Sequence, residues 1–215
     1  MCEQGSPEWR QSRVGRLCAS DAGAMLSTTK SGEAAARRDL RIKLALERLT
    51  SEPAEDVYVN ADMQRGRQLE ASARSAYEAQ TGAMVSCVGF LRSDDLMVGC
   101  SPDGLLDDGR GGLELKCPRP ANHLKYLRGG VVPTEYVGQL RHSLWVTGAD
   151  YWDFASYAPQ FPEGLQLFIC RMPRVDVDLG AYESAVRAFL SEVETEVQAL
   201  RTMTNLGAVL QEALA

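Results

Sequence analysis

Residues 101–104 read Ser-Pro-Asp-Gly, and residues 113–116 read Leu-Glu-Leu-Lys. Ten residues separate Asp103 from Glu114, so the turn leads directly into a β-hairpin. Because successive side chains of a strand point to opposite faces, Glu114 and Lys116 share one face and the two leucines share the other. The leucines suit a core. An acid and a base placed together suit phosphate chemistry at a divalent metal.

Each of these residues also has a simpler explanation. Ser-Pro-Asp-Gly is a good turn sequence, and Glu114 and Lys116 could form a cross-strand ion pair. Short motifs match by chance often. The combination is more informative than its parts, because the turn precedes a strand that presents Glu114 and Lys116 on one face.

The bulk properties are those of a globular protein. The chain has 215 residues, of which 45% are hydrophobic and 24% are charged, so it fits one domain with extensions. No apolar stretch approaches the roughly 20 residues of a membrane helix. Residues 1–16 are polar and lack a signal-peptide core. We therefore expect a cytoplasmic protein with no membrane partner.

Cysteine and histidine usage argues against two kinds of metal centre. The six cysteines form no Cys-x-x-Cys pair, and the only histidines are His123 and His142, which disfavours structural zinc and iron–sulphur clusters. We expect the cysteines to be buried thiols in a reducing compartment. Neither histidine has an assignable role, and we expect His142 to be a helix residue packed near the site.

The charge is distributed unevenly. The net charge is −6, which is unusual for a nucleic-acid binder, yet residues 1–50 hold nine Lys and Arg against six Asp and Glu. An acidic protein can still bind DNA when its positive charge is focused in a groove. Charge alone favours a solvated surface instead. The acidic segment after about residue 178 would be repelled by DNA, so we expect it to face away or to contact another subunit.

Periodicity and turn residues predict helices that alternate with short strands. The expected helices are about 21–26, 33–49, one that Asn60 caps and Gly82 ends, 121–128, 133–148 and 178–203. The expected strands are about 84–91, 96–101, 112–117, 151–158 and 165–171. This order predicts an α/β fold in which a mixed central sheet is flanked by helices, with extra helices at both ends.

Glu70 is a third carboxylate of interest. It lies at the edge of an apolar stripe on the helix before the first expected strand, and a half-buried glutamate needs a partner. A metal shared with Asp103 and Glu114 would be one such partner. An ion pair with Arg67 or Arg74 on the same helix is the alternative.

These residues together resemble a known nuclease signature. Pro102-Asp103, ten residues and then Glu114-x-Lys116 resemble the PD-(D/E)xK motif, and the order of elements resembles the restriction-endonuclease-like core of that superfamily. Over most of its length the chain is similar to the viral recombination and alkaline nucleases of the bacteriophage lambda exonuclease type. The blocks that carry this likeness are Glu8-Trp9, Arg13, Gly15, Ala19-Ser20, 66–70, 100–104, 112–118, 136–139 and 143–147.

The resemblance implies a metal site. Asp103, Glu114 and the backbone carbonyl of Leu115 would hold Mg²⁺, for which Mn²⁺ could substitute, with two ions per site. Glu70 would complete or support this site. The resemblance also implies a single nuclease domain over 1–215. Its parts are a core of about 60–171, an N-terminal helical part over 1–59 and a C-terminal helix over about 178–203.

Two further polar residues have implied roles in hydrolysis. Lys116 would orient or deprotonate the attacking water, whose pKa a bound metal lowers towards neutrality. Gln139, on the helix after the hairpin, would support the nucleophile or Lys116.

The family also has a pocket for a 5′-terminal phosphate, and Arg13, Ser20 and Ser101 match it by position. A guanidinium suits a phosphate, and hydroxyl groups add donors. The alternatives are a surface arginine, a helix cap and a turn serine. Met63 matches an apolar residue that wedges between DNA strands, although a core or surface methionine is an alternative.

The resemblance implies a Mg²⁺-dependent 5′-to-3′ exodeoxyribonuclease that resects linear double-stranded DNA to leave 3′ single-stranded tails for homologous recombination. It also implies a ring-shaped homotrimer, a single-strand annealing protein as partner, and a phage or prophage gene expressed in a bacterial cell. One alternative is an endonuclease or repair nuclease on the same core. The other is a non-catalytic DNA-binding protein, which the presence of Glu70, Asp103, Glu114 and Lys116 disfavours.

Overall fold

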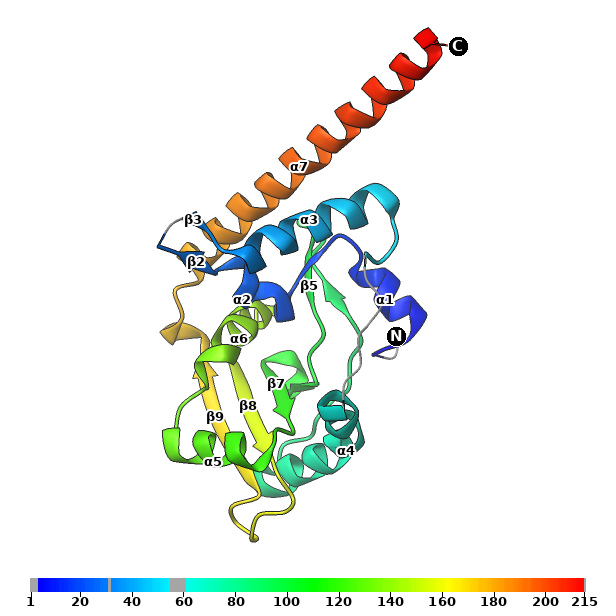
Figure 1. Cartoon of the computed structure of the whole chain (residues 1–215). Coiled ribbons are helices and arrows are strands. Elements are labelled where there is room, and N and C mark those ends of the chain that lie inside the picture. The colour runs from blue at the N-terminus through cyan, green and yellow to red at the C-terminus, as the bar shows by residue number, and fades with distance from the viewer. Residues whose placement is uncertain (1–3, 31, 55–60, 215) are drawn as a thin grey trace.

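The computed structural model describes residues 4–30, 32–54 and 61–214, without the side chains of 61–63 and 205–214 (Figure 1). The α-helices are α1 (Pro7–Arg13), α2 (Ala22–Met25), α3 (Ala35–Thr50), α4 (Ala61–Thr81), α5 (Pro120–Gly129), α6 (Thr134–Thr147) and α7 (Leu179–Leu214). The strands are β1 (Leu17–Cys18), β2 (Thr28–Thr29), β3 (Gly32–Glu33), β4 (Leu91–Arg92), β5 (Val98–Cys100), β6 (Gly104–Leu106), β7 (Gly111–Lys116), β8 (Tyr151–Tyr157) and β9 (Leu167–Pro173). No helix in the described part of the chain is long and apolar enough to cross a bilayer.

A four-stranded mixed sheet lies at the centre, in the order β6-β7-β8-β9. Strands β7 and β8 are parallel, and the other two pairs are antiparallel. On one face, Ala73 and Tyr77 of α4 pack against Leu113 and Leu115 of β7. On the other face, α5 and α6 cover the sheet, with Leu140 of α6 among the residues packed there. The α/β class expected from the sequence is confirmed.

Two glycines at the start of β7 allow the parallel pairing with β8. Gly111 lies opposite Tyr151, and Gly112 lies opposite Trp152. A Cβ atom on Gly112 would come within 2.3 Å of the Trp152 ring, and one on Gly111 would come within 2.2 Å of the Tyr151 ring. The aromatic rings of β8 therefore lie directly over the glycine backbone, which a larger residue at the start of β7 would prevent.

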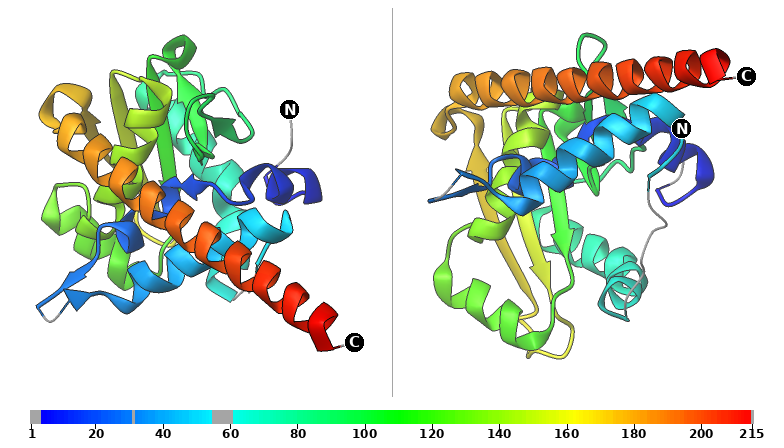
Figure 2. Two further views of the ribbon diagram at one scale, coloured as in Figure 1. Left: turned by 90° about the horizontal axis from the view of Figure 1, so that it is seen from above. Right: turned by 45° about the horizontal axis from the view of Figure 1, so that its top comes forward.

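A second core lies between α3, α7 and a separate sheet of order β1-β5-β4. Leu40 and Leu44 of α3 are buried against α7, whose Phe189 and Val193 are fully buried. Figure 2 shows α7 lying along α3 across the molecule. The long terminal helix is thus held by apolar packing over its first half.

Ion pairs flank the contact between α3 and α7. Arg37 donates from both terminal nitrogens to Glu192, at 2.7 and 2.9 Å. Longer pairs are Arg41–Glu196 at 3.6 Å and Arg48–Glu194 at 3.6 Å. The acidic segment that we expected to face away or to contact another subunit therefore contacts arginines of its own chain, which belong to the basic N-terminal part.

The expected elements are found with corrections at two helices and at the strands. The helix expected over about 178–203 continues to Leu214, and α1 was not among the expected helices. The strand expected over 84–91 is wrong: these residues form an isolated bridge between Ser86 and Leu105, and only Leu91 belongs to a strand. The bridge partner, β6, spans just three residues, so it offers little edge for pairing. Cys87 is exposed rather than buried, whereas Cys18 and Cys100 are buried free thiols. Asn60, the expected cap of α4, lies outside the described residues.

His142 lies on α6 as expected but faces the second core instead of the polar site. Its Nε2 lies 3.2 Å from the Gly99 carbonyl, so this nitrogen carries the hydrogen. Its Nδ1 accepts from the Tyr182 hydroxyl of α7 at 2.7 Å. Trp145 packs edge-on against the ring, and Arg141 lies over the ring of Tyr182. Burial lowers the pKa of His142 to about 4.

This burial predicts an acid-sensitive contribution to stability. In the unfolded chain the histidine is protonated below its ordinary pKa of about 6.5, whereas in the folded state it becomes protonated only near pH 4. Stability from this group is therefore present above about pH 6.5 and is lost as the pH falls. Between pH 7.5 and 5 the loss should be about 2 kcal/mol.

Urea unfolding at pH 7.5 and pH 5 measures this loss. The His142→Gln variant keeps one donor and one acceptor but does not titrate, so its stability should fall by about 2 kcal/mol less than that of the parent. An equal fall in both proteins would show that His142 is protonated in the folded state at pH 5.

Candidate active site

The loop that carries Asp103 is bound to the backbone of β7 by two hydrogen bonds. The Asp103 amide donates to the Leu113 carbonyl at 3.1 Å. The Asp103 carboxylate in turn accepts from the Leu115 amide at 2.7 Å. Asp103 therefore lies against the strand that carries Glu114, as the spacing of the two motifs predicts.

Glu114 lies in the middle of β7 with 3% of its surface exposed. Its Oε1 accepts from Lys116 Nζ and, at 2.6 Å, from the Gln139 amide of α6. Burial raises the pKa of Asp103 well above its ordinary value, and the nearby negative charge of Glu114 raises it further. Burial alone would lower the pKa of Lys116, but Glu114 and Asp103 outweigh burial and raise it.

Glu70 lies on the wall of the same pocket, on α4. Its Oε1 accepts from Arg74 one turn along at 2.7 Å, which is the ion pair that the sequence offered as the alternative. Its negative charge also contributes to the raised pKa of Asp103, so the two carboxylates are close enough to repel each other. Glu70 thus has both the local partner and the position facing Asp103.

The donor set fits a hard divalent cation. Glu114 is a buried carboxylate and Asp103 a half-buried one, their charges oppose each other, and Leu115 lines the pocket beside them. Oxygen donors of this kind are the ligands that Mg²⁺ and Mn²⁺ prefer. Within the described residues, no three His, Cys, Asp or Glu side chains are grouped closely enough to form a complete cage. Water or substrate oxygens would complete the coordination.

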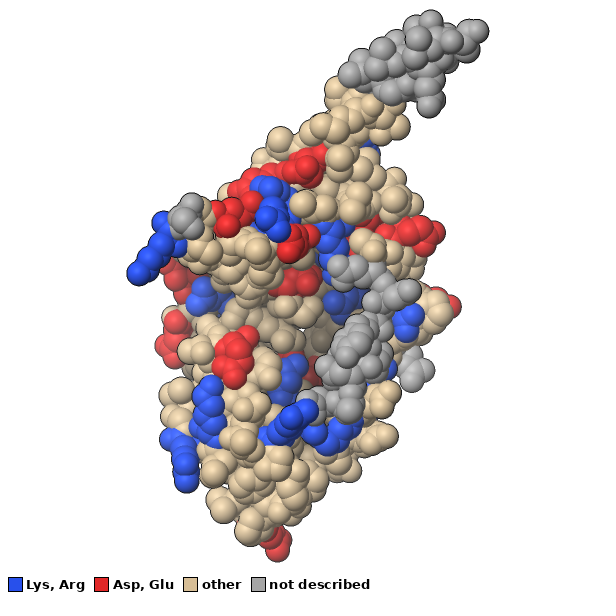
Figure 3. Space-filling view, in the orientation of Figure 1, with Lys and Arg blue, Asp and Glu red and all other residues tan. Residues whose placement is uncertain are grey.

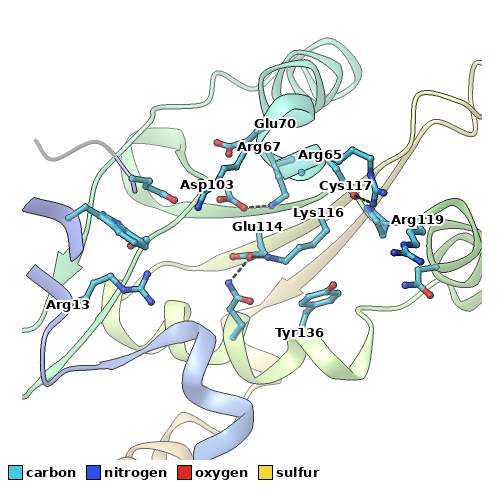
Figure 4. A pocket seen from close by; sticks show the side chains of 18 residues that line it. Arg13, Arg65, Arg67, Glu70, Asp103, Glu114, Lys116, Cys117, Arg119 and Tyr136 are labelled. Atoms are coloured by element: carbon cyan, nitrogen blue, oxygen red, sulfur yellow. Dashed lines mark hydrogen bonds and ion pairs between the residues drawn. The ribbon is translucent and has the colours of Figure 1, made fainter. Parts of the chain in front are cut away.

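These groups line one open pocket with a volume of about 910 Å³, shown in Figure 4. It is formed between α1, α4, β7 and the first turns of α5 and α6. Its charged lining residues are Arg13, Arg65, Arg67, Glu70, Asp103, Glu114, Lys116 and Arg119. Figure 3 shows Lys and Arg side chains gathered over the lower half of one face of the molecule, where Figure 1 has α4 and α5.

The three residues matched to a phosphate pocket lie together at one end. Arg13 and Ser101 line the pocket, and Arg13 donates to the Ser20 hydroxyl at 3.3 Å. The Trp9 ring lies 4.2 Å from the Arg13 guanidinium carbon, and its indole N–H donates to Ser101 at 2.9 Å. Met63 belongs to α4, but its side chain lies outside the described part of the structure.

Sequence reasoning assigned no role to several residues that line the pocket. Trp9 links Arg13 to Ser101, and the Tyr136 ring lies 5.3 Å from Lys116 Nζ. Both stand in the motif blocks, which was the available signal. The other unassigned polar residues of the lining are Gln4, Arg65 and Asn122. They lie in a turn before α1, on α4 and in the first turn of α5, and local spacing gave no signal that they would line one pocket.

A family model described as the YqaJ-like viral recombinase domain matches residues 8–150. This match covers more than half of the chain and includes α1 from its second residue, the whole hairpin and α6. This chain belongs to the YqaJ-like viral recombinase family. The likeness to nucleases of the lambda exonuclease type, expected from the motif blocks, is confirmed.

Solved structures extend this comparison. The alkaline exonuclease LHK-Exo from Laribacter hongkongensis is 34% identical, with a TM-score of 0.83 over 93% of this chain and 98% of that one. LHK-Exo in complex with dAMP matches with the same identity and TM-score, over 94% and 100% of the two chains. A search among curated proteins found no significant match.

A more distant structure shares the fold alone. A phage-related exonuclease from Haemophilus somnus is 11% identical, with a TM-score of 0.64 over 88% of this chain and 96% of that one. Family membership and the likeness to LHK-Exo together identify the chain as a nuclease.

The buried carboxylates predict a response to divalent cations. A cation between Asp103 and Glu114 would relieve their repulsion, so 10 mM Mg²⁺ should raise the melting temperature by about 2–5 °C at constant ionic strength. The Asp103→Asn variant should lose this shift and should be more stable than the parent in metal-free buffer, because the carboxylate that repels Glu114 is removed.

Thermal melts with Mg²⁺, Mn²⁺ or matched NaCl measure both effects. Asp95→Asn, at an exposed aspartate, serves as the control and should keep the shift of the parent. A full metal shift in Asp103→Asn would show that the cation binds elsewhere.

Proposed function

We propose that this protein is a Mg²⁺-dependent exodeoxyribonuclease that degrades one strand of linear double-stranded DNA from its 5′ end and leaves 3′ single-stranded tails for homologous recombination. The observation that carries the proposal is the convergence of Asp103, Glu114, Lys116 and Gln139 on one pocket that also contains Arg13. Hydrolytic and phosphate-binding groups are thereby placed side by side.

Each side chain has a role in the proposed hydrolysis. Asp103 and Glu114, with the Leu115 carbonyl, would hold the metal, and Glu70 would support it from α4. A bound divalent cation supplies a more acidic water and neutralises charge on the phosphate. Gln139 fixes the carboxylate of Glu114 through its 2.6 Å hydrogen bond.

Lys116 is placed to act on the attacking water. Its Nζ already contacts Glu114 at the pocket wall, and Tyr136 lies over its other side. From there the ammonium group orients the water, or the neutral amine takes its proton, and the positive charge of the ammonium form balances the negative charge that develops on the phosphate.

The 5′-to-3′ direction rests on the end of the pocket that contains Arg13. The Arg13 guanidinium and the hydroxyls of Ser20 and Ser101 offer donors that suit the extra charge of a terminal phosphate monoester. The structure of LHK-Exo with dAMP supports a pocket that accepts a mononucleotide, the size of one product. Met63 is proposed as the wedge that separates the strands.

We extend the proposal to assembly and context. Residues 1–215 form one nuclease domain, because α1 supplies part of the pocket wall and α7 packs on α3. Two metal ions per site, a homotrimeric ring around DNA and a single-strand annealing partner follow from the family resemblance. A phage or prophage gene and action in the cytoplasm of a bacterial host follow from the viral recombinase family.

Product analysis tests the reaction. A linear duplex labelled at either 5′ or 3′ ends should release labelled mononucleotides early only from the 5′ label, and only with Mg²⁺ or Mn²⁺. Asp103→Ala and Lys116→Ala should each lower the rate roughly 100-fold or more, since metal binding or proton transfer is lost.

Other outcomes separate the alternatives. Cleavage of covalently closed circular duplex would favour the endonuclease. Binding of duplex ends without hydrolysis under any metal condition would favour the non-catalytic DNA-binding protein.

The terminal phosphate provides a second test. Arg13→Ala should reduce the preference for 5′-phosphorylated over 5′-hydroxyl duplex by about tenfold, because one charge-assisted contact is lost. Arg187→Ala, at an exposed arginine paired with Glu183 on α7, is the control and should keep the preference. If both variants lose it equally, the assignment of Arg13 is wrong.

A further inference from the structure

A second group of phosphate-binding side chains lies at the other end of the pocket. Arg65, Arg119 and Asn122 line the pocket and are here called the distal cluster. Figure 4 shows Arg13 and Arg119 on opposite sides of Glu114 and Lys116. The carboxylates of the candidate site therefore lie between two basic ends.

Contacts within the fold hold the distal cluster at the exit of β7. Arg65 of α4 donates to the Cys117 carbonyl at 3.2 Å, just beyond the last residue of the strand. Arg119 follows two residues later as the N-terminal cap residue of α5, and Asn122 lies in the first turn of that helix. Three side chains from two helices thus meet where the chain leaves the sheet.

The pocket differs in charge from the protein as a whole. The chain has a net charge of −6. The pocket wall has five cationic side chains against three carboxylates, and these carboxylates are Glu70, Asp103 and Glu114. The residues from 117 to 122 include no acid. Positive charge is therefore focused at both ends of a pocket whose centre is acidic, which suits a polyanion lying along the pocket.

We propose that the distal cluster binds the backbone phosphate that follows the scissile phosphate on its 3′ side, in the strand being cut. This inference rests on the proposed function. If the terminal phosphate lies at Arg13 and hydrolysis occurs beside Asp103, the rest of the strand leaves past Arg119. Guanidinium forks suit phosphate oxygens, and an asparagine amide adds a further donor.

The arrangement also explains how the site holds its substrate after each cut. When the terminal nucleotide leaves, the contacts at Arg13 are lost, but the distal cluster still holds the shortened strand. The remaining strand need move only one nucleotide along the pocket to present its new 5′ phosphate at Arg13.

Neutral linkages test the contact directly. Linear 5′-phosphorylated duplexes would each have a single methylphosphonate at one of the first four linkages 3′ to the first scissile bond. The rate of release of the first nucleotide and the KM would be measured with the full-length parent and with Arg119→Gln. The parent should lose about tenfold in kcat/KM at one linkage position, because one charge-assisted contact is removed there.

The test compares the effect of the Arg119 substitution and of the methylphosphonate, alone and combined. On unmodified DNA, Arg119→Gln should lose a similar factor in kcat/KM, mainly through a higher KM. The methylphosphonate at the linkage that affects the parent should then lower the kcat/KM of this variant little further. Arg128→Gln is the matched control, because Arg128 is an exposed arginine in the last turn of the same helix. Its effect should be the same at every linkage position.

Several results would overturn the inference. Additive losses at all positions would mean that Arg119 makes no contact with a particular phosphate. Coupling to linkages in the complementary strand, or 5′ to the cut, would assign the cluster to another part of the DNA. A parent that releases no 5′ mononucleotides from unmodified duplex would instead contradict the proposed function, so the two failures are distinct.

Discussion

The candidate site depends on one costly arrangement, the burial of the Glu114 carboxylate next to that of Asp103. Two like charges in a protein interior are unfavourable unless partners hold them. Glu114 obtains its partners from Lys116 on the same strand and Gln139 on α6, while Asp103 is held by the Leu115 amide. Strand β7, α6 and the loop after β5 must therefore stay fixed relative to one another, and the fold around the site serves that requirement.

The packing of β7 shows how the fold keeps the two carboxylates and their partners in fixed positions. The strand is central, so its leucines are buried under α4 while the opposite face lies under α6. Gly111 and Gly112 let the aromatic rings of β8 cross its start, and Phe154 of β8 lies opposite Glu114 in the parallel register. The acid thus projects between apolar neighbours, where it can turn only towards the pocket.

The sequence predicted the parts of this arrangement that depend on local spacing. The alternation along β7 placed Glu114 and Lys116 on one face, and the turn at Asp103 was readable from Ser-Pro-Asp-Gly. Most expected helices were also found within about two residues of their expected bounds, because caps and periodicity are local signals, but α7 continues to Leu214 instead of ending near residue 203. The strand expected over 84–91 failed, since pairing depends on an edge that the short β6 does not offer. The distal cluster was hidden for a similar reason: α4 and the start of α5 come to one pocket through tertiary packing, with no fixed spacing in sequence.

The negative net charge of the chain does not describe the charge of the pocket, because oppositely charged segments pair elsewhere in the fold. Arg37, Arg41 and Arg48 of the basic N-terminal part form ion pairs with glutamates of the acidic C-terminal part across α3 and α7, and none of these residues lines the pocket. The pocket is left with cations at both ends and carboxylates at its centre. A divalent cation at those carboxylates would reduce the repulsion that a DNA strand meets at the centre of this path. Metal binding and DNA binding should therefore favour each other in this arrangement, since each ligand reduces the electrostatic cost of the other.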